Sequence, residues 1–233
     1  MKNIKALTLA FLLSVFGSSY ALAEYGVTVG VTGSMAMIDA SGTEIEGNAK
    51  ERSDADVSNN AGVGSIFVEY NDIGGTGLSL GIDLIPGAAD VSSSINQRTD
   101  TESSVTGTTT NTTTSRTQKA QAELENHMTL YATYGTGNGV YVKLGYVQVD
   151  LNTLESLGTG SKYGNETLTG FSYGAGVEFD LYTNTVGRFE INRVEYEDIS
   201  LRSSVARAGV TANNLIEADL DVTLLSASLG YKF

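Results

Sequence analysis

Glu125, His127 and Thr129 stand two positions apart, so an extended strand would present all three side chains on one face. A carboxylate, an imidazole and a hydroxyl in this arrangement are the groups that activate a nucleophile for acyl transfer. His127 is also the single histidine of the chain. The plainer interpretation, which we weigh beside this one, is that His127 is one polar residue among many on the inner face of a strand.

The His127–Thr129 pair resembles the His-x-Ser pair that outer-membrane lipid A deacylases, which are small barrels, carry on one strand. It differs in having Thr in the place of Ser, and no acid follows at the matching distance. We therefore expect no catalytic residue, and a lipid-modifying enzyme is the third of three functional interpretations.

Metal and cofactor motifs give no better candidate. The acidic residues around Asp54 and Asp56 lack the central Gly and the final Glu of a calcium loop. The sequence contains no phosphate loop, dinucleotide fingerprint or zinc spacing. We expect neither a metal nor a cofactor.

A second group of chemically interesting residues consists of charged side chains at alternate positions of several segments. Charges that meet inside a closed barrel must pair, because an unpaired ion in a low-dielectric interior is costly. We expect the two bases to bridge the three acids and to plug the lumen. This lumen charge network comprises Glu69, Lys143, Glu178, Arg188 and Glu190.

Strict alternation of apolar with small or polar residues identifies the elements that hold these groups. At the end of the chain Leu225, Leu229 and Phe233 share one face, and Ser226 and Ser228 lie on the other. The fold class expected is all-β, an eight-stranded antiparallel up-and-down transmembrane β-barrel, with apolar residues facing lipid. Such alternation occurs at about 25–38, 62–70, 78–86, 123–134, 140–151, 168–182, 187–197 and 219–233.

The seventh segment breaks its own alternation. Phe189 and Ile191 have one parity, whereas Val194 and Tyr196 have the other. A bulge near Asn192 would place all four on one face, and we expect one there.

Connections alternate between short turns and long loops. The long loops are expected at about 39–61, 87–122, 152–167 and 198–218. This pattern is typical of barrels with short periplasmic turns, and an even number of strands places both termini in the periplasm. The Thr-rich stretch 99–115 is compatible with an exposed hairpin or with a disordered loop.

Aromatic residues gather at the predicted short-turn rim. Tyrosine rings at the level of lipid headgroups form a girdle in membrane barrels. The expected girdle comprises Tyr25, Tyr70, Tyr134, Tyr182, Tyr231 and Phe233.

The amino-terminal residues 1–23 have the pattern of a cleaved secretory signal peptide. Lys2 and Lys5 precede a mostly apolar run, and Ala21 and Ala23 form an A-x-A site before Glu24. The barrel domain would then be 24–233, with 12 basic and 27 acidic residues and a net charge of −15. This charge argues against a nucleic-acid partner, and the absence of cysteine excludes disulfides.

Three short motifs resemble one family. The run GFSYGAGVEF at 170–179, the pair Glu195–Tyr196 and the run YVKLGY at 141–146 are similar to strands of the OmpA/OmpX-like outer-membrane β-barrel (porin-like) family of Gram-negative bacteria. The resemblance implies a monomer in the bacterial outer membrane, in contact with lipid and lipopolysaccharide. It also implies recognition of the carboxyl-terminal strand, with Phe233, by the barrel-assembly machinery. It implies no shared catalytic residue.

Function within such a fold depends on loops and lumen. The first interpretation is a non-enzymatic outer-membrane protein whose surface loops serve a structural, adhesive or envelope role. The alternative is a small porin-like channel for ions or small solutes.

Overall fold

The computed structural model describes residues 26–46, 51–106, 110–155, 162–204 and 213–233. Within these ranges no helix is long and apolar enough to cross a membrane. The elements are β1 (Val27–Glu46), β2 (Glu51–Tyr70), the 3-10 turn η1 (Ile73–Gly75), β3 (Leu78–Asp90), β4 (Asn96–Thr106), β5 (Thr110–Ala120), β6 (Ala122–Gly135), β7 (Val140–Thr153), β8 (Glu166–Tyr182), β9 (Thr185–Tyr196), β10 (Ile199–Arg202) and β11 (Leu215–Lys232).

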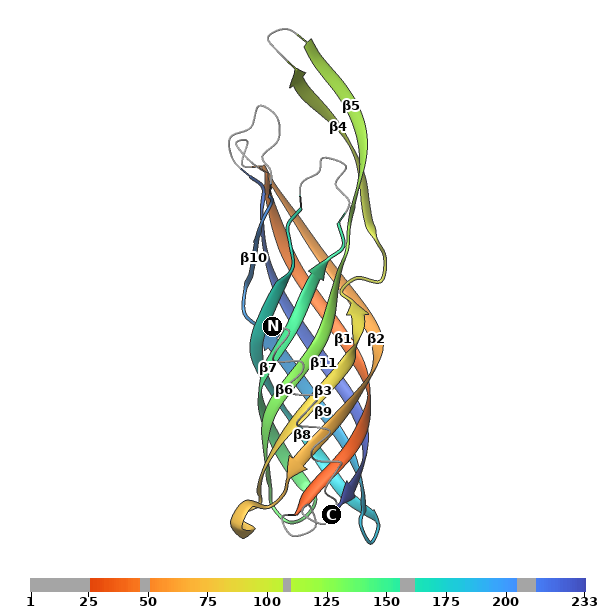
Figure 1. Cartoon of the computed structure of the whole chain (residues 1–233), viewed down its shortest axis with the longest axis vertical. Coiled ribbons are helices and arrows are strands. Elements are labelled where there is room, and N and C mark those ends of the chain that lie inside the picture. Colours follow the sequence, from red (N-terminus) through yellow and green to blue (C-terminus); the bar gives the residue numbers. More distant parts are fainter. Residues whose placement is uncertain (1–25, 47–50, 107–109, 156–161, 205–212) are drawn as a thin grey trace.

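Eight of these strands close into an antiparallel barrel, in the order β1-β2-β3-β6-β7-β8-β9-β11 around the described part of the wall (Figure 1). β11 pairs back to β1 from Lys232 opposite Thr28 to Leu215 opposite Ile45. The short β10 follows β9 along the same edge of β11. The described strands therefore close on themselves, and the predicted fold class is confirmed.

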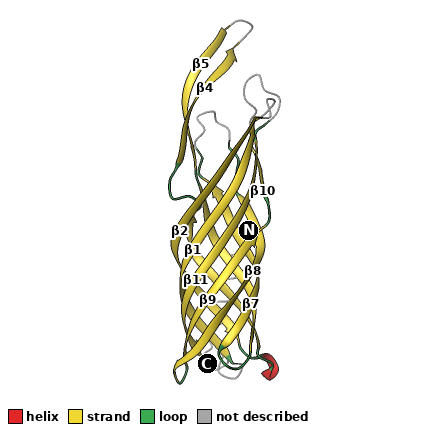
Figure 2. Cartoon of the chain, turned by 180° about the vertical axis from the view of Figure 1, so that it is seen from behind, coloured by secondary structure: helices red, strands yellow, loops and turns green. Residues whose placement is uncertain are grey.

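The two ends of the barrel differ. The turn that contains η1 and the carboxyl-terminal Phe233 lie at one end, which we call the short-turn end (Figure 1). The β4–β5 hairpin rises beyond the other strands at the opposite end, which we call the long-loop end (Figure 2). Its backbone pairs from Asn96 opposite Ala120 to Thr106 opposite Thr110. Of the two possibilities that the Thr-rich sequence left open, the structure has the hairpin.

The expected loops contain more strand than the sequence predicted. β1 and β2 pair without interruption up to Glu46 and Glu51, through most of the segment 39–61. The segments 87–122 and 198–218 also contain strand, whereas the described residues 154–155 and 162–165 between β7 and β8 do not. The outward apolar alternation ends near Met35, but the hydrogen-bonded ladder between β1 and β2 continues beyond it.

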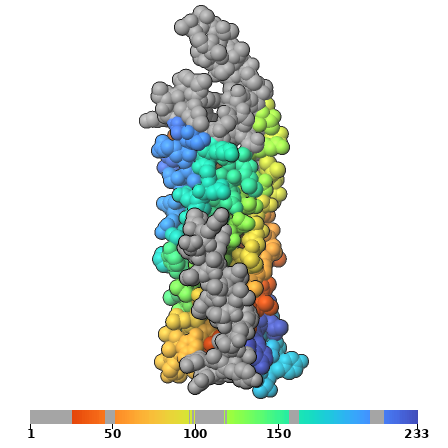
Figure 3. All heavy atoms as spheres, viewed as in Figure 1, coloured from red at the N-terminus to blue at the C-terminus, as the bar shows by residue number. Residues whose placement is uncertain are grey.

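Large apolar side chains cover the outside of the barrel towards the short-turn end. Their exposed fractions of about one half would be unfavourable in water and are typical of a lipid-facing surface. The described residues form one elongated body along the barrel axis (Figure 3). Among the exposed residues are Val31, Leu80, Leu130, Leu144, Phe171, Ile191 and Leu229.

Aromatic side chains lie at both limits of this apolar surface. Tyr70, Tyr134, Tyr182 and Tyr231 are exposed near the short turns, and the Tyr231 ring meets Phe233 edge-on with centroids 4.9 Å apart. At the other limit the rings of Tyr146 and Phe171 lie 6.0 Å apart. Of the predicted girdle, Tyr25 lies outside the described residues, as do the predicted signal segment, Ala21 and Ala23.

Along the strands the apolar residues pass from the outer face to the inner face, and β7 shows this change most clearly. Its outward residues are first Val142, Leu144 and Tyr146 and then Gln148 and Asp150. Its inward residues are first Lys143 and Gly145 and then the buried Val147, Val149 and Leu151. The half of the barrel towards the long-loop end is therefore organised like a water-soluble protein, with an apolar interior and a polar exterior.

This change corrects the prediction for the seventh segment. β9 keeps an unbroken register with β11 and β8 through Asn192 and Arg193, so the expected bulge is absent from β9. Phe189 and Ile191 face outwards, whereas Val194 is buried inside with 1% of its surface exposed. The apolar residues of β9 change parity because they face outwards near the short-turn end and inwards near the long-loop end.

Candidate functional site

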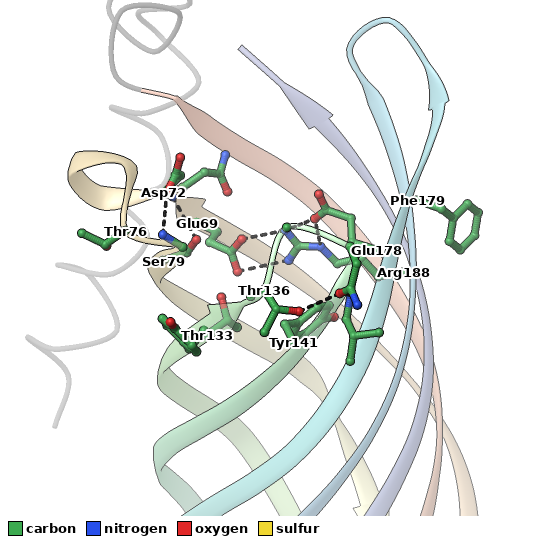
Figure 4. A pocket seen from close by; sticks show the side chains of 18 of the residues that line it. Glu69, Asp72, Thr76, Ser79, Thr133, Thr136, Tyr141, Glu178, Phe179 and Arg188 are labelled. Atoms are coloured by element: carbon green, nitrogen blue, oxygen red, sulfur yellow. Dashed lines mark hydrogen bonds and ion pairs between the residues drawn. The ribbon is translucent and has the colours of Figure 1, made fainter.

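The interior of the barrel is the candidate site, and its charged residues cluster towards the short-turn end. Arg188 of β9 donates two hydrogen bonds to Glu69 of β2, Nη2 to Oε1 at 2.6 Å and Nη1 to Oε2 at 3.1 Å. Its Nε also donates to Oε2 of Glu178 on β8, at 2.8 Å. Arg188 therefore lies between two carboxylates (Figure 4). Lys232 donates to the other oxygen of Glu178 at 2.7 Å.

The remaining pair of the predicted network lies nearer the middle of the barrel. Nζ of Lys143 is 3.2 Å from Oε1 of Glu190, and both side chains are almost fully buried. The same ammonium lies 4.1 Å from the centre of the Tyr131 ring. Arg188 and Lys143 thus contact the three predicted glutamates, Arg188 two of them and Lys143 the third. Lys232 joins the network from the closing strand.

Aromatic rings, which the sequence reasoning missed, fill the space between these charges. Phe67 and Tyr141 lie within cation–π distance of Arg188, at 5.2 and 5.8 Å. Each ring lies over a glycine of the paired strand, Phe67 over Gly30 and Tyr141 over Gly176. Tyr131 has the same relation to Gly81. An inward-parity aromatic opposite a glycine was the sequence signal that could have identified this packing.

Beyond the charges, towards the long-loop end, the interior is closed by apolar side chains. Each fully buried Val, Leu or Ile of this set contributes about 1.5–3 kcal/mol relative to an exposed one. We call this set the apolar layer. It comprises Ala36, Ile38, Val91, Leu124, Val147, Val149, Leu151, Leu168, Val194, Ile199, Leu220 and Val222.

The space between the charge network and the apolar layer is very small. A cavity there has a volume of about 30 Å³, enough for about one water molecule. His127 and Thr129 line it, and Nδ1 of His127 is buried without a hydrogen-bond partner among the described residues. The predicted face shared by Glu125 and His127 is wrong. Asn126 adopts a positive φ of 55° at a register shift in β6, and this shift places Glu125 on the outside, where Asn152 binds it.

Two larger cavities lie at opposite ends of the described barrel. The one at the short-turn end has a volume of about 870 Å³ and is lined by Glu69, Arg188 and Lys232 together with turn residues. The one at the long-loop end has about 410 Å³ and mostly apolar walls. Among the described residues no group of three or more His, Asp or Glu side chains is placed to hold a metal ion.

A closed barrel with an outer apolar band, aromatic limits and a filled, partly charged interior is an outer-membrane barrel. A family model described as "Outer membrane protein beta-barrel domain" matches residues 8–233. The chain belongs to this family, which places it in the bacterial outer membrane and confirms the predicted resemblance. No curated protein sequence matches it.

Similar solved structures include OprG from Pseudomonas aeruginosa and the protease OmpT from Escherichia coli. OprG is 15% identical with a TM-score of 0.50, over 89% of this chain and 96% of its own. OmpT is 10% identical with a TM-score of 0.50, over 89% of this chain and 97% of its own. At such identities the similarity shows the fold alone.

Proposed function

We propose that this outer-membrane barrel is a non-enzymatic surface protein. Its lipid-facing part is an anchor, and its long-loop end is the part that contacts the surroundings of the cell. The observation that carries the proposal is the filled interior. The charge network and the apolar layer lie in series along the axis, and the cavity beside the Lys143–Glu190 pair has room for about one water between them.

We further propose that the short turns and both termini face the periplasm. The polar exterior of the long-loop half supports this orientation, because it suits water above a membrane surface. On that exterior Arg193 binds Asp221 at 2.8 Å, and Asn152 binds Glu123 and Glu125. The β4–β5 hairpin would then be the part of the described chain that lies furthest from the cell (Figure 1).

A small channel is the second candidate function. The cavities at the two ends of the lumen favour it, because together they leave only the middle of the barrel closed. Conduction would require both the charge network and the apolar layer to rearrange. This requirement makes the channel the weaker candidate.

Catalysis by the group around His127 has little structural support. Glu125 lies on the opposite face of β6, so the imidazole has no carboxylate from that residue. The cavity beside His127 and Thr129 has about 30 Å³, which is far too small for an acyl chain. We therefore propose that His127 is a lining residue.

Excision of the hairpin tests the surface role directly. Residues 92–121 are replaced by a three-residue Gly-Asn-Gly turn, because the backbone N–H of Val91 already donates to the carbonyl of Ala122 at 2.9 Å. We expect heat-modifiable barrels that still insert, and cells that lose adhesion or phage adsorption supported by the intact protein. Planar-bilayer recordings accompany the assay. A large, stable open level for the wild-type protein would overturn the surface role in favour of the channel.

A further inference from the structure

The cavity at the long-loop end has the composition of a binding site for a small amphipathic molecule. Its volume of about 410 Å³ falls within the range of small-molecule sites. Apolar side chains from several strands form most of its wall, and the apolar layer forms its floor. The apolar wall includes Val57, Val91, Leu151, Ile199, Leu201 and Leu220.

The charged side chains among the described lining residues are all acidic. Glu44, Asp54 and Glu155 line the cavity, and none of its described lining residues is Lys or Arg. Among the described lining residues, a ligand with a carboxylate or a phosphate would therefore meet only like charges, whereas a cationic group would meet opposite ones.

Glu44 and Glu155 differ in their hydrogen-bond partners. Oε1 of Glu44 accepts hydrogen bonds from the Tyr163 hydroxyl at 2.8 Å and from Nδ2 of Asn214 at 3.1 Å. Oε1 of Glu155 accepts one from the backbone N–H of Tyr163 at 2.8 Å. Oε2 of Glu155 is buried and has no partner among the described residues. A buried acceptor without a donor costs free energy that a ligand donor would recover.

We propose that this cavity binds a small primary amine with a short apolar chain. The ammonium group supplies three donors and a positive charge, and Glu155 is its principal partner. The chain of the amine lies against the apolar wall, where burial of each methylene contributes about 0.8 kcal/mol. This inference does not depend on the proposed surface role, because the cavity is formed mainly by the mouth of the barrel, and the excised segment 92–121 contributes only Ser92, Ala120 and Gln121 to its wall.

Three probes of equal chain length separate the chemical contributions. n-Hexylamine, 1-hexanol and hexanoate are titrated into the refolded full barrel in lipid nanodiscs, and empty nanodiscs give the background from partition into lipid. We expect saturable binding of hexylamine, at least tenfold weaker binding of hexanol and no binding of hexanoate. Equal signals from all three probes, or a hexylamine signal equal to that of empty nanodiscs, would overturn the proposal.

Two variants and a control locate the binding. Glu155→Gln keeps the shape of the side chain and removes its charge, and we expect it to weaken hexylamine about tenfold. Ala218→Phe fills the cavity and should abolish binding in a barrel that still shows heat-modifiable migration. Glu166→Gln removes the same charge from an exposed position that does not line the cavity, and it should bind as the wild type does. Undiminished hexylamine binding by Glu155→Gln would sink the idea, whether or not Ala218→Phe folds.

Discussion

Arg188 and Glu69 are separated by 119 positions in the sequence, yet they form a two-pronged ion pair across the barrel interior, with Nη2 2.6 Å from Oε1. Their side chains are 7% and 2% exposed. The pair joins β9 to β2, which are not neighbours in the sheet. It therefore links opposite parts of the wall through the lumen and not through the backbone ladder.

Removal of one partner should destabilise the barrel strongly. Glu69→Gln leaves a buried guanidinium with less countercharge, and breaking a buried pair in this way costs about 3–5 kcal/mol. The free energy of unfolding is measured by urea titration in lipid vesicles, followed by circular dichroism. Arg193→Met, which breaks the partly exposed pair with Asp221, should cost less than about 1 kcal/mol. Equal losses of unfolding free energy in the two variants would show that the buried pair contributes no more to stability than the partly exposed pair.

The glycine beneath an interior ring should be intolerant of a side chain. A Cβ at Gly176 would lie 2.6 Å from the ring of Tyr141, so Gly176→Ala should cost about 1–3 kcal/mol of unfolding free energy. Tyr141→Ala combined with Gly176→Ala should cost less than the sum of the single changes, because the overlap with the ring is gone and only the carbonyl oxygen of Phe189, at 2.8 Å, still crowds the new Cβ. Gly33→Ala is the control, since nothing lies within 4 Å of a Cβ there. Strict additivity would contradict this account of the packing.

Conductance should require two barriers to be removed. Arg188→Ala alone should stay silent in planar bilayers, because the apolar layer still closes the lumen. A triple variant with Val149→Ala and Val194→Ala as well should give measurable openings, since both side chains are buried in that layer. A steady current through Arg188→Ala alone would show that the charge network is the only gate.

Orientation in the membrane can be tested by thiol labelling, because the natural chain has no cysteine. Thr117→Cys lies in the β4–β5 hairpin and should react with an impermeant maleimide on intact cells. Thr136→Cys lies in a short turn and should react only after the outer membrane is permeabilised. The reverse pattern would mean that the barrel is inserted the other way round.

His127 should be dispensable for any chemistry on lipid. Purified protein should release no acyl chain from lipopolysaccharide, and His127→Ala should leave the products unchanged, because His127 has only a cavity of about 30 Å³ beside it. Mass spectrometry of the lipid measures this. Hydrolysis by the wild type that disappears in His127→Ala would restore the enzyme interpretation.

Much of the fold could be predicted because lipid imposes a period of two on the strands. The same parity placed Arg188, Glu69 and Lys143 inside, and charge balance suggested how they pair. The alternation predicted the wrong face for Glu125, where an irregularity of the backbone reverses the alternation. A positive φ at Asn126, which is not a glycine, moves Glu125 to the outside, and the sequence gives no sign of such a bulge.

Strand ends and the apolar layer could not be predicted for a different reason. A single solvent along the whole of each face would make Val194 a sign of a bulge and the segment 39–61 a loop. In the structure, the outer solvent changes from lipid to water while the hydrogen-bonded ladder continues. The predicted girdle and the predicted signal segment remain predictions.

The exchange of polarity at Tyr146 and Val147 also determines how deeply the barrel sits in the bilayer. A shift along the axis by one residue pair, about 6–7 Å of strand, would move Gln148 into hydrocarbon or Leu144 into water. Both displacements are unfavourable, so the vertical position of the barrel is held between opposing forces. A bilayer that becomes thicker or thinner must therefore deform around this protein, since the protein gains nothing by sliding.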